Sequence, residues 1–369
     1  MTPMRVLSLV IPCYNEESTL SQIVEAVLSL KSEKTGVEIV IVDDCSTDGS
    51  LAVAKSLKAR HPEIKVVAHE RNMGKGAALR TGFLSATGDY VGIQDADLEY
   101  NPADYLRMMK LLEEGLADVV FGSRYLRRSE RICLRWWHST MNRFLTLCSN
   151  AFSDLDLTDM ETCYKLFRRE VIQEIAGELR ENRFGFEPEV VAAVARGVRS
   201  SGWRIGEVAI EYRPRAFAEG KKICWKDGVR ALYCISHYNA PSLPAVMQLC
   251  LYFLIGVTAA IVNVAVFELL YRACAVVFPV SVSVAFFVAA GVNYLLCIAF
   301  LFRHRSRWGA AGEIMAYFVT ILVMLLLDYG VTAGLMALSF SSFWAKALSN
   351  VVGFFGNYLM RRLFVFKCS

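Results

Sequence analysis

Residues 91–100 read VGIQDADLEY, and they predict both a buried strand and a binding site. Residues 90–94 form an apolar run, and Asp95 and Asp97 follow where this run ends. Open α/β sheets bind their ligands at the carboxyl ends of the strands. Two carboxylates at such a point can hold one Mg²⁺ or Mn²⁺, which in turn binds a diphosphate. For an isolated Asp-x-Asp, the alternative is an ordinary acidic turn.

Strand and helix patterns alternate on both sides of this stretch. Strands are expected at 6–11, 38–42, 64–68, 90–94 and 118–122, and helices at 17–29, 50–59, 75–86 and 102–114. Alternation at this spacing favours a mainly parallel sheet with crossover helices. Residues 1–240 are therefore expected to form an α/β nucleotide-binding domain.

Two further loops that follow predicted strands carry polar side chains. They read PCYNEE at 12–17 and DDCSTDGS at 43–50. Asp44 and Glu16 can accept hydrogen bonds from a nucleotide base and ribose, and Tyr14 can stack on a planar group. The glycine-rich turn RNMGKG at 71–76 opens a helix and suits the close approach of a phosphate or base, although it lacks the P-loop spacing.

The composition indicates a membrane part. Of the 369 residues, 54% are hydrophobic, which is high for a wholly soluble protein. Four apolar segments lie at about 248–271, 277–302, 314–338 and 343–366, and each is long enough to cross a bilayer with some tilt. Residues 245–369 are therefore expected to form an all-α domain of four transmembrane helices. A soluble helix bundle is the alternative.

The distribution of basic residues predicts the topology of these segments. Arg303, Arg305 and Arg307 follow the second segment and Arg361, Arg362 and Lys367 the fourth, whereas the other side has Arg272 and Lys346. By the positive-inside rule, the N-terminal domain and the C-terminus face the cytosol. The short apolar run at the N-terminus is unlike a signal peptide, which agrees with this topology. In a bacterium or archaeon the membrane would be the plasma membrane.

Two stretches beside the predicted bilayer have the composition of interfacial helices. Residues 131–152 and 225–238 mix basic and aromatic side chains with leucine. Amphipathic helices of this kind lie in the headgroup layer. The alternative is that each is an ordinary surface helix docked on the α/β domain.

Charge and cysteine usage exclude several functions. The net charge is only +4 and no aromatic–basic RNA-binding pattern is present, so nucleic acid is not an expected partner. The 11 cysteines show no metal-ligand spacing, and the 5 histidines are isolated from one another. Neither a zinc site nor a disulfide framework is expected.

Six motifs together resemble a known family. They are VIPCYNEE, VDDCSTDGS, RNMGKGAALRTGF, QDADLEY, GSRY and DMETCYK. The chain resembles the family-2 inverting glycosyltransferases with a Rossmann-like GT-A fold, and among them the polyprenyl-phosphate hexose synthases typified by dolichyl-phosphate mannose synthase. Its C-terminal part resembles the GtrA-like four-helix membrane domain. The resemblance implies transfer of a hexose from GDP-mannose or UDP-glucose to dolichyl or undecaprenyl phosphate at the cytosolic membrane face.

The resemblance also implies roles for individual residues. The nucleoside would contact Pro12, Tyr14, Glu16, Val42 and Asp44, and its ribose and diphosphate would contact Asp95, Ala96 and Asp97. A Mg²⁺ or Mn²⁺ ion would bind to Asp95, Asp97 and Glu99. The acceptor phosphate would bind to Arg124 and Arg135, and the donor phosphates to Arg215 and Lys221. Asp97 and Arg124 would be the catalytic residues. Typical mannose synthases carry Gln at the position of Glu99 and an Asp-Pro-x-Ser-Gly loop where this chain reads DMETC at 159–163, so the donated sugar stays open.

Two other functions are compatible with parts of this pattern. A processive polysaccharide synthase resembles the same fold, but such enzymes need a Gln-x-x-Arg-Trp motif that this sequence lacks. Four helices are also few for a translocating channel. A flippase is the second alternative, in which the membrane part moves a lipid-linked sugar across the bilayer.

Overall fold

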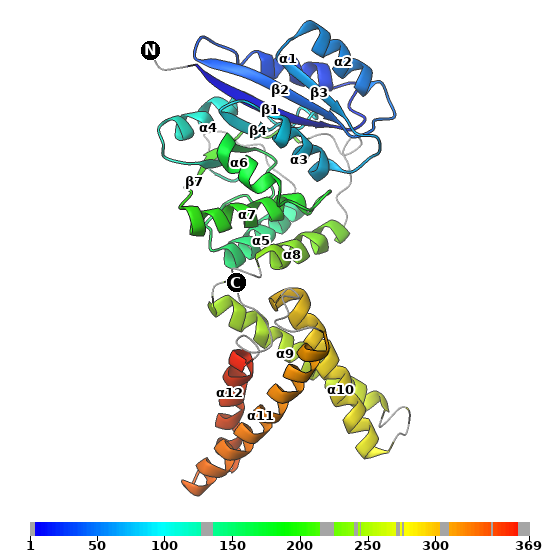
Figure 1. Cartoon of the computed structure of the whole chain (residues 1–369), viewed down its shortest axis with the longest axis vertical. Helices are drawn as coiled ribbons and strands as arrows, with labels where there is room; N and C mark the ends of the chain where they lie inside the picture. Colours follow the sequence, from blue (N-terminus) through cyan, green and yellow to red (C-terminus); the bar gives the residue numbers. More distant parts are fainter. Residues whose placement is uncertain are drawn as a thin grey trace. The chain divides into compact units, whose positions relative to one another are not determined.

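The computed structural model divides the chain into two compact units, Met1–Tyr238 and Asn239–Ser369. It describes residues 4–126, 136–214, 225–239, 243, 245–270, 274, 277–302, 310–340 and 342–360. The first unit is an α/β domain and the second is helical (Figure 1).

A seven-stranded sheet forms the centre of the first unit, in the order β3-β2-β1-β4-β6-β5-β7. The strands are β1 (Arg5–Cys13), β2 (Thr35–Asp43), β3 (Ile64–Ala68), β4 (Tyr90–Ile93), β5 (Val119–Ser123), β6 (Lys165–Arg168) and β7 (Ile205–Ala209). The β1–β2, β1–β4, β2–β3 and β5–β7 pairs are parallel, whereas β6 runs antiparallel to β4 and β5. This mainly parallel sheet confirms the expected fold class.

Helices cover both faces of the sheet (Figure 1). They are α1 (Leu20–Leu28), α2 (Ser50–Arg60), α3 (Lys75–Ser85), α4 (Asp104–Glu113), α5 (Trp136–Ser153), α6 (Arg169–Ala176), α7 (Phe186–Ser201) and α8 (Trp225–Asn239). Successive strand residues point to opposite faces. Leu7 and Leu9 of β1 therefore pack in one core with α1, α2 and α4, whereas Val10 packs in a second core with α3, α6 and α7.

The structure differs from the expected elements mainly between residues 123 and 210. Here β6, β7, α6 and α7 were not predicted. Strand β6 has only 4 residues and begins at the last residue of the DMETCYK motif. Helix α1 begins at Leu20 rather than at residue 17. The reason is tertiary: the Glu17 carboxylate accepts a hydrogen bond from the Gly49 amide (2.8 Å), and the Glu16 amide donates to Ser50 (2.8 Å).

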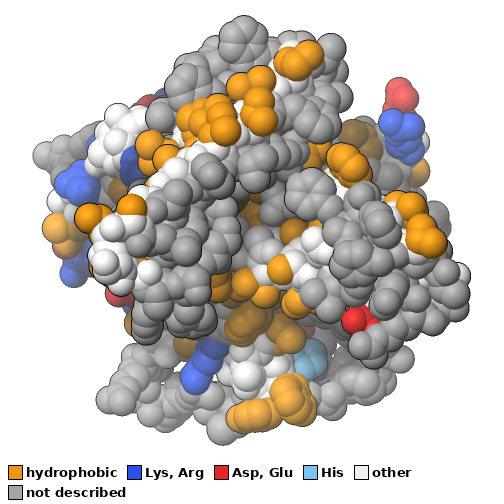
Figure 2. Space-filling view, turned by 90° about the horizontal axis from the view of Figure 1, so that it is seen from below, with side chains coloured by type: hydrophobic (Ala, Val, Ile, Leu, Met, Phe, Trp, Pro, Cys, Tyr) orange, Lys and Arg blue, Asp and Glu red, His pale blue; other side chains and the backbone are white. Residues whose placement is uncertain are grey.

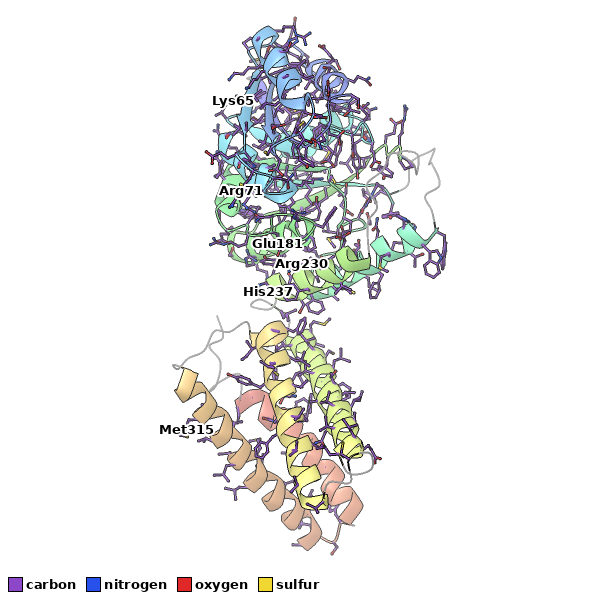
Figure 3. The ribbon with its side chains drawn as sticks, turned by 90° about the vertical axis from the view of Figure 1, so that its right-hand side faces the viewer. Lys65, Arg71, Glu181, Arg230, His237 and Met315 are labelled. Carbon is purple, nitrogen blue, oxygen red and sulfur yellow. The ribbon has the colours of Figure 1, made fainter. Side chains whose placement is uncertain are left out.

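The two helices expected at the membrane interface belong to the first unit. In α8, Ala231, Cys234 and Ile235 are buried, and Arg230 forms an ion pair of 2.6 Å with Glu181 (Figure 3). Helix α5 is docked through Leu145, yet Trp136 and Trp137 are 68% and 73% exposed. Both helices are thus docked on the α/β domain, and whether they also contact lipid stays a prediction.

The second unit consists of helices with exposed apolar surfaces. They are α9 (Ala245–Glu268), α10 (Phe278–Leu296) with its π-helical continuation Cys297–Phe302, α11 (Ala310–Ala337) and α12 (Ser342–Met360). Within the described part of the chain, only residues 246–263 of α9 form a span long and apolar enough to cross a membrane, with a mean hydropathy of 1.9. The end view in Figure 2 shows exposed hydrophobic side chains, and Met315 of α11 in Figure 3 is 66% exposed.

Candidate active site

The carboxyl ends of β1, β2 and β4 meet at one edge of the sheet, called here the rim. Backbone hydrogen bonds join the loops at this edge: the Asp44 amide donates to the Cys13 carbonyl (2.8 Å), and the Gln94 amide to the Val10 carbonyl (2.9 Å). The three polar loops that the sequence placed after strands are therefore neighbours in space. This is the edge where parallel sheets bind ligands.

Asp95 is held at the rim by an ion pair. The Lys75 ammonium, in the first turn of α3, lies 2.7 Å and 2.9 Å from the two Asp95 carboxylate oxygens. It also lies 3.1 Å from the Cys163 sulfur. Burial alone would raise the pKa of Asp95, but the Lys75 charge and hydrogen bonds outweigh it and lower the pKa. The partner of Asp95 in this structure is thus a lysine.

Asp97 lies two residues further on, in a surplus of negative charge. Burial first, then the charges of Asp95 and Glu99, raises the pKa of Asp97 to about 7. An Asp97 oxygen accepts a hydrogen bond from the Glu99 amide (3.2 Å), and the Glu99 carboxylate accepts one from the Tyr212 hydroxyl (3.1 Å). A carboxylate whose pKa is raised by burial and by neighbouring carboxylates favours a bound cation.

Asp44 organises the loop that precedes α3. Its carboxylate accepts hydrogen bonds from the amides of Met73 (2.9 Å) and Gly74 (2.7 Å), and lies 2.8 Å from Nδ1 of His69. Its side chain is only 4% exposed. Asp44 therefore holds the loop before α3 in place at the rim, and this structural role is independent of nucleoside binding.

The backbone at residues 181–182 packs directly against the glycine-rich turn at 71–76. A Cβ atom on Gly74 or on Gly76 would lie 2.3 Å from a backbone oxygen, of Asn182 and Glu181 respectively. Gly74 also has a φ of +96°, a conformation that side chains disfavour. These two glycines are required for packing against residues 181–182. The approach of a phosphate or base at this turn stays a prediction.

The other residues expected to contact the nucleoside differ in accessibility. Tyr14 is 45% exposed, whereas Val42 and Ala96 are buried at 0% and 3%. Pro12 pairs with Val42 in the β1–β2 ladder, and Glu16 accepts a hydrogen bond from the Thr19 hydroxyl (2.8 Å). Val42 and Ala96 therefore present almost no surface to a ligand in this structure.

A pocket of about 490 Å³ opens beside this edge, at the end of β3. Ala68, His69, Glu70, Arg71 and Met73 line it, and Figure 3 labels Arg71. His69 joins the pocket to Asp44 through the contact described above. The pocket thus adjoins the loop where the sequence predicts a nucleoside.

The Arg124 side chain is held in place by an ion pair with Asp159. Its Nε and Nη2 atoms donate to the two Asp159 oxygens at 2.7 Å and 2.8 Å, and its amide donates to the same carboxylate at 3.0 Å. The Asp159 side chain is fully buried and that of Arg124 is 10% exposed. A guanidinium carries five N–H bonds, and two of those of Arg124 donate to Asp159. The other three do not point to Asp159.

Three expected phosphate-binding residues, Arg135, Arg215 and Lys221, lie outside the described residues. Among the described side chains, no group of three or more His, Cys, Asp or Glu forms a metal site. Sequence reasoning gave no role to Lys75, Asp159 or Glu161, although all three stand in quoted motifs. Their proximity to Asp95 and Arg124 depends on the fold.

Comparison with known proteins connects this geometry to two families. Residues 8–176 match the glycosyl transferase family 2 model, and residues 251–366 match the model of the GtrA/DPMS transmembrane domain. The chain therefore carries a family 2 glycosyltransferase domain followed by a GtrA/DPMS transmembrane domain. The transmembrane domain indicates an integral membrane protein.

Curated relatives of this glycosyltransferase carry the names of lipid-phosphate sugar transferases. The chain is 31% identical over 217 residues to a dodecaprenyl-phosphate galacturonate synthase of Rhizobium johnstonii, covering 58% of this chain and 61% of the relative. It is 29% identical over 222 residues to an undecaprenyl-phosphate 4-deoxy-4-formamido-L-arabinose transferase of Serratia proteamaculans, covering 59% and 63%. The chain thus spans less than two thirds of the length of these relatives.

Two solved structures are also similar to this glycosyltransferase. A glucosyl-3-phosphoglycerate synthase of Mycobacterium tuberculosis, in complex with Mn²⁺, UDP and glucosyl-3-phosphoglycerate, has a TM-score of 0.48 and 19% identity, with coverage of 65% of this chain and 81% of that one. A mannosyl-3-phosphoglycerate synthase of Rubrobacter xylanophilus has a TM-score of 0.47 and 20% identity, with coverage of 64% and 73%.

Proposed function

We propose that this protein transfers a hexose from a nucleotide sugar to a polyprenyl phosphate at the cytosolic membrane face, with inversion at the anomeric carbon. The observation that carries the proposal is the carboxylate pair Asp95 and Asp97 at the carboxyl end of β4, in a glycosyltransferase joined to a membrane domain. The names of the two relatives support a polyprenyl phosphate as acceptor. Both GDP-mannose and UDP-glucose remain candidate donors.

The donor nucleotide is assigned to the rim and the adjoining pocket. Tyr14 offers an exposed ring for stacking, and Asp44 stands beside the pocket that contains Arg71. Arg215 and Lys221, which follow the described end of the segment at residue 214, are assigned to the donor phosphates. Guanidinium and ammonium groups are the usual partners of phosphate oxygens.

A divalent cation, Mg²⁺ or Mn²⁺, is assigned to Asp97 and Glu99. The fit rests on three carboxylates, Asp95, Asp97 and Glu99, that follow β4 at alternate positions. Burial first, and then the charges of Asp95 and Glu99, raises the pKa of Asp97, and a cation would offset these charges. Asp95 already has Lys75 as its counter-ion, so it is assigned beside the cation and not as a main ligand. Two protein carboxylates suit Mg²⁺, which usually takes its other ligands from water and phosphate. When bound, such an ion stabilises the negative charge of a departing diphosphate.

The chemistry needs no general base. A polyprenyl phosphate is anionic at neutral pH, so one of its oxygens can attack the anomeric carbon directly. The new C–O bond forms as the bond to the nucleoside diphosphate breaks, and the electron pair leaves with the diphosphate. The protein must align the acceptor and stabilise the leaving group. Arg124 is assigned to alignment, because Asp159 fixes its plane and leaves donors for a phosphate.

The membrane acceptor explains why an α/β transferase would carry exposed tryptophans. Trp136 and Trp137 lie at the start of α5, next in sequence to Arg135. Aromatic and basic residues together favour the headgroup layer of a bilayer. We assign this end of α5 to the lipid surface from which the acceptor phosphate enters, with Arg135 as a second phosphate contact.

The test is a transfer assay on the full-length protein in lipid-supplemented detergent. It uses Mn²⁺ or Mg²⁺, undecaprenyl phosphate and a panel of labelled nucleotide sugars, followed by extraction of the lipids. Label in the organic phase is expected for at least one donor, and its absence for every donor would refute the proposal.

Asp97→Asn should lower the rate at least ~10²-fold and remove the Mn²⁺-dependent rise in melting temperature, since it removes a cation ligand but no core volume. Glu114→Gln, which removes an exposed carboxylate at the end of α4, is the control.

A further inference from the structure

The loop between α5 and β6 contacts Lys75 and Arg124, and one of its acidic side chains has a buried oxygen that accepts no hydrogen bond from any described residue. On one side, Asp159 binds Arg124 at 2.7 Å. On the other side, the Cys163 sulfur lies 3.1 Å from the Lys75 ammonium, which also holds Asp95. In sequence, Glu161 lies two residues from each of these anchors. The charge of Arg124, which is assigned to the acceptor phosphate, also acts on the Glu161 carboxyl.

The Glu161 Oε1 atom is buried and has no hydrogen-bond partner within the described residues, a feature that among the carboxylates it shares with Asp43 Oδ1. The other Asp43 oxygen accepts a hydrogen bond from the Ser46 amide (3.2 Å). In contrast, Glu189 accepts hydrogen bonds from the amides of Arg180 (2.7 Å) and Glu181 (2.8 Å), and Glu207 accepts one from the amide of Thr158 (2.9 Å). Buried polar atoms of native proteins are nearly always paired, so an exception calls for a ligand or another explanation.

The cations near Glu161 are already engaged. Lys165 is buried and bonded to Glu187, and Arg124 is bonded to Asp159. Burial first, and then the charge of Glu187, raises the pKa of Glu161 to about 7, although Lys165 and Arg124 act in the opposite direction. The free oxygen of Glu161 thus has the chemistry of an acceptor that a sugar hydroxyl could satisfy, and an added anion would be repelled there.

We infer that Glu161 is a specificity-determining residue that accepts a hydrogen bond from a hydroxyl of a neutral donor sugar and discriminates against uronic acid donors. This inference rests on the proposed function. A hydroxyl would pair the free oxygen, whereas a sugar carboxylate would bring a second negative charge into a buried site.

The test compares neutral donors with their uronate counterparts in the full-length protein. The pairs are UDP-glucose and UDP-glucuronate, UDP-galactose and UDP-galacturonate, and GDP-mannose and GDP-mannuronate. For each pair we measure kcat/KM with undecaprenyl phosphate and, separately, the donor Kd without acceptor. The wild type should favour the neutral member at least tenfold in both quantities. Glu161→Gln, which keeps the shape and removes the charge, should reduce that preference at least fivefold.

Glu189→Gln is the matched control, because Glu189 is a buried carboxylate whose oxygens are bonded away from the loop. It should keep the wild-type ratio. A wild type that prefers uronate donors, or a Glu161→Gln variant whose ratios stay within twofold, would overturn the inference. If no donor supports transfer but the Kd ratios shift as described, the proposed function fails and the role of Glu161 in donor discrimination stands. If transfer occurs with unchanged ratios, the inference alone fails.

Discussion

At the scale of single residues, the site depends on buried charges that neutralise one another. Arg124 and Asp159 form one pair, Lys75 and Asp95 a second, and Lys165 and Glu187 a third. A buried ion pair adds little net stability, but removing one member leaves a charge without a counter-ion. The pairs therefore hold the rim in one arrangement and make it sensitive to single changes.

Asp159→Asn should destabilise the α/β domain by about 3–5 kcal/mol, because it leaves the buried Arg124 guanidinium uncompensated. The free energy of unfolding measured with denaturant gives this value. The control is Glu114→Gln, which breaks an exposed ion pair with Lys110 (3.7 Å) and should cost about 0–1 kcal/mol. Equal effects of the two changes would contradict this account of the Arg124–Asp159 pair.

Glu38 should give the domain a pH-dependent stability. Burial alone would raise its pKa, but hydrogen bonds from Lys65, Ser8 and Thr87 lower it from 4.5 to about 2. Because the folded pKa is depressed, the stabilisation is present above the unfolded value and is lost as the pH falls from about 5 to 2. It should amount to roughly 3 kcal/mol.

The measurement is the free energy of unfolding between pH 7 and pH 3 for the wild type and Glu38→Gln. The variant should be less stable at pH 7, and its deficit should shrink toward pH 3. A deficit that is the same at both pH values would mean that the Glu38 charge has no such role. Lys65, labelled in Figure 3, lies 2.6 Å from the Glu38 carboxylate.

At the scale of elements, α3 lies directly on β1. A Cβ atom on Gly82 would lie 2.1 Å from a methyl group of Val10, so only glycine allows this approach. The first turn of the same helix carries Lys75, the partner of Asp95. The packing of one helix on one strand thus determines where a site residue stands.

Gly82→Ala should destabilise the domain by about 1–3 kcal/mol and lower activity, because α3 must move away from β1. Gly177→Ala is the matched control: a Cβ there meets nothing within 4 Å, and its φ of −68° suits alanine. It should be neutral or stabilise by about 0.4–1 kcal/mol. Thermal melting and the transfer assay check both variants, and a neutral Gly82→Ala would contradict the packing argument.

At the scale of the whole molecule, the proposed function joins an α/β catalytic unit to a helical membrane unit. The exposed tryptophans of α5 are the part of the catalytic unit best suited to contact lipid. In the proposed topology this surface and the basic residues at 303–307 and 361–367 belong to the cytosolic side.

Changing both Trp136 and Trp137 to serine should raise the KM for undecaprenyl phosphate in vesicles several-fold and leave the donor KM unchanged. The fold should persist, since both side chains are mostly exposed. Leu116→Ser is the control, because Leu116 is 62% exposed at a distance in sequence from either proposed interfacial helix. An unchanged acceptor KM in the double variant would remove α5 from the lipid surface.

Strong local patterns made much of this molecule predictable. The strands at 64–68 and 90–93 and the helix from Lys75 were expected almost to the residue, because buried strands and glycine-bounded helices carry clear periodicity. The 4-residue strand β6 has no such signal, and its antiparallel pairing with β4 and β5 depends on partners far away in sequence. The DMETCYK motif is a local pattern and was recognised. The contacts of Asp159 and Cys163 were not predicted, because their partners are also far away in sequence.

The sequence by itself determined the α/β class, the apolar C-terminal segments and the carboxylates that follow β4, because periodicity, hydropathy and motif spacing are local properties. Only the tertiary structure decided that Lys75 neutralises Asp95, that Asp159 fixes Arg124, and that the glycine-rich turn packs against residues 181–182. The physical reason is that these interactions join residues 20 to more than 100 positions apart. Chain folding brings them within ångströms, and no pattern in a short window of residues specifies such a distance.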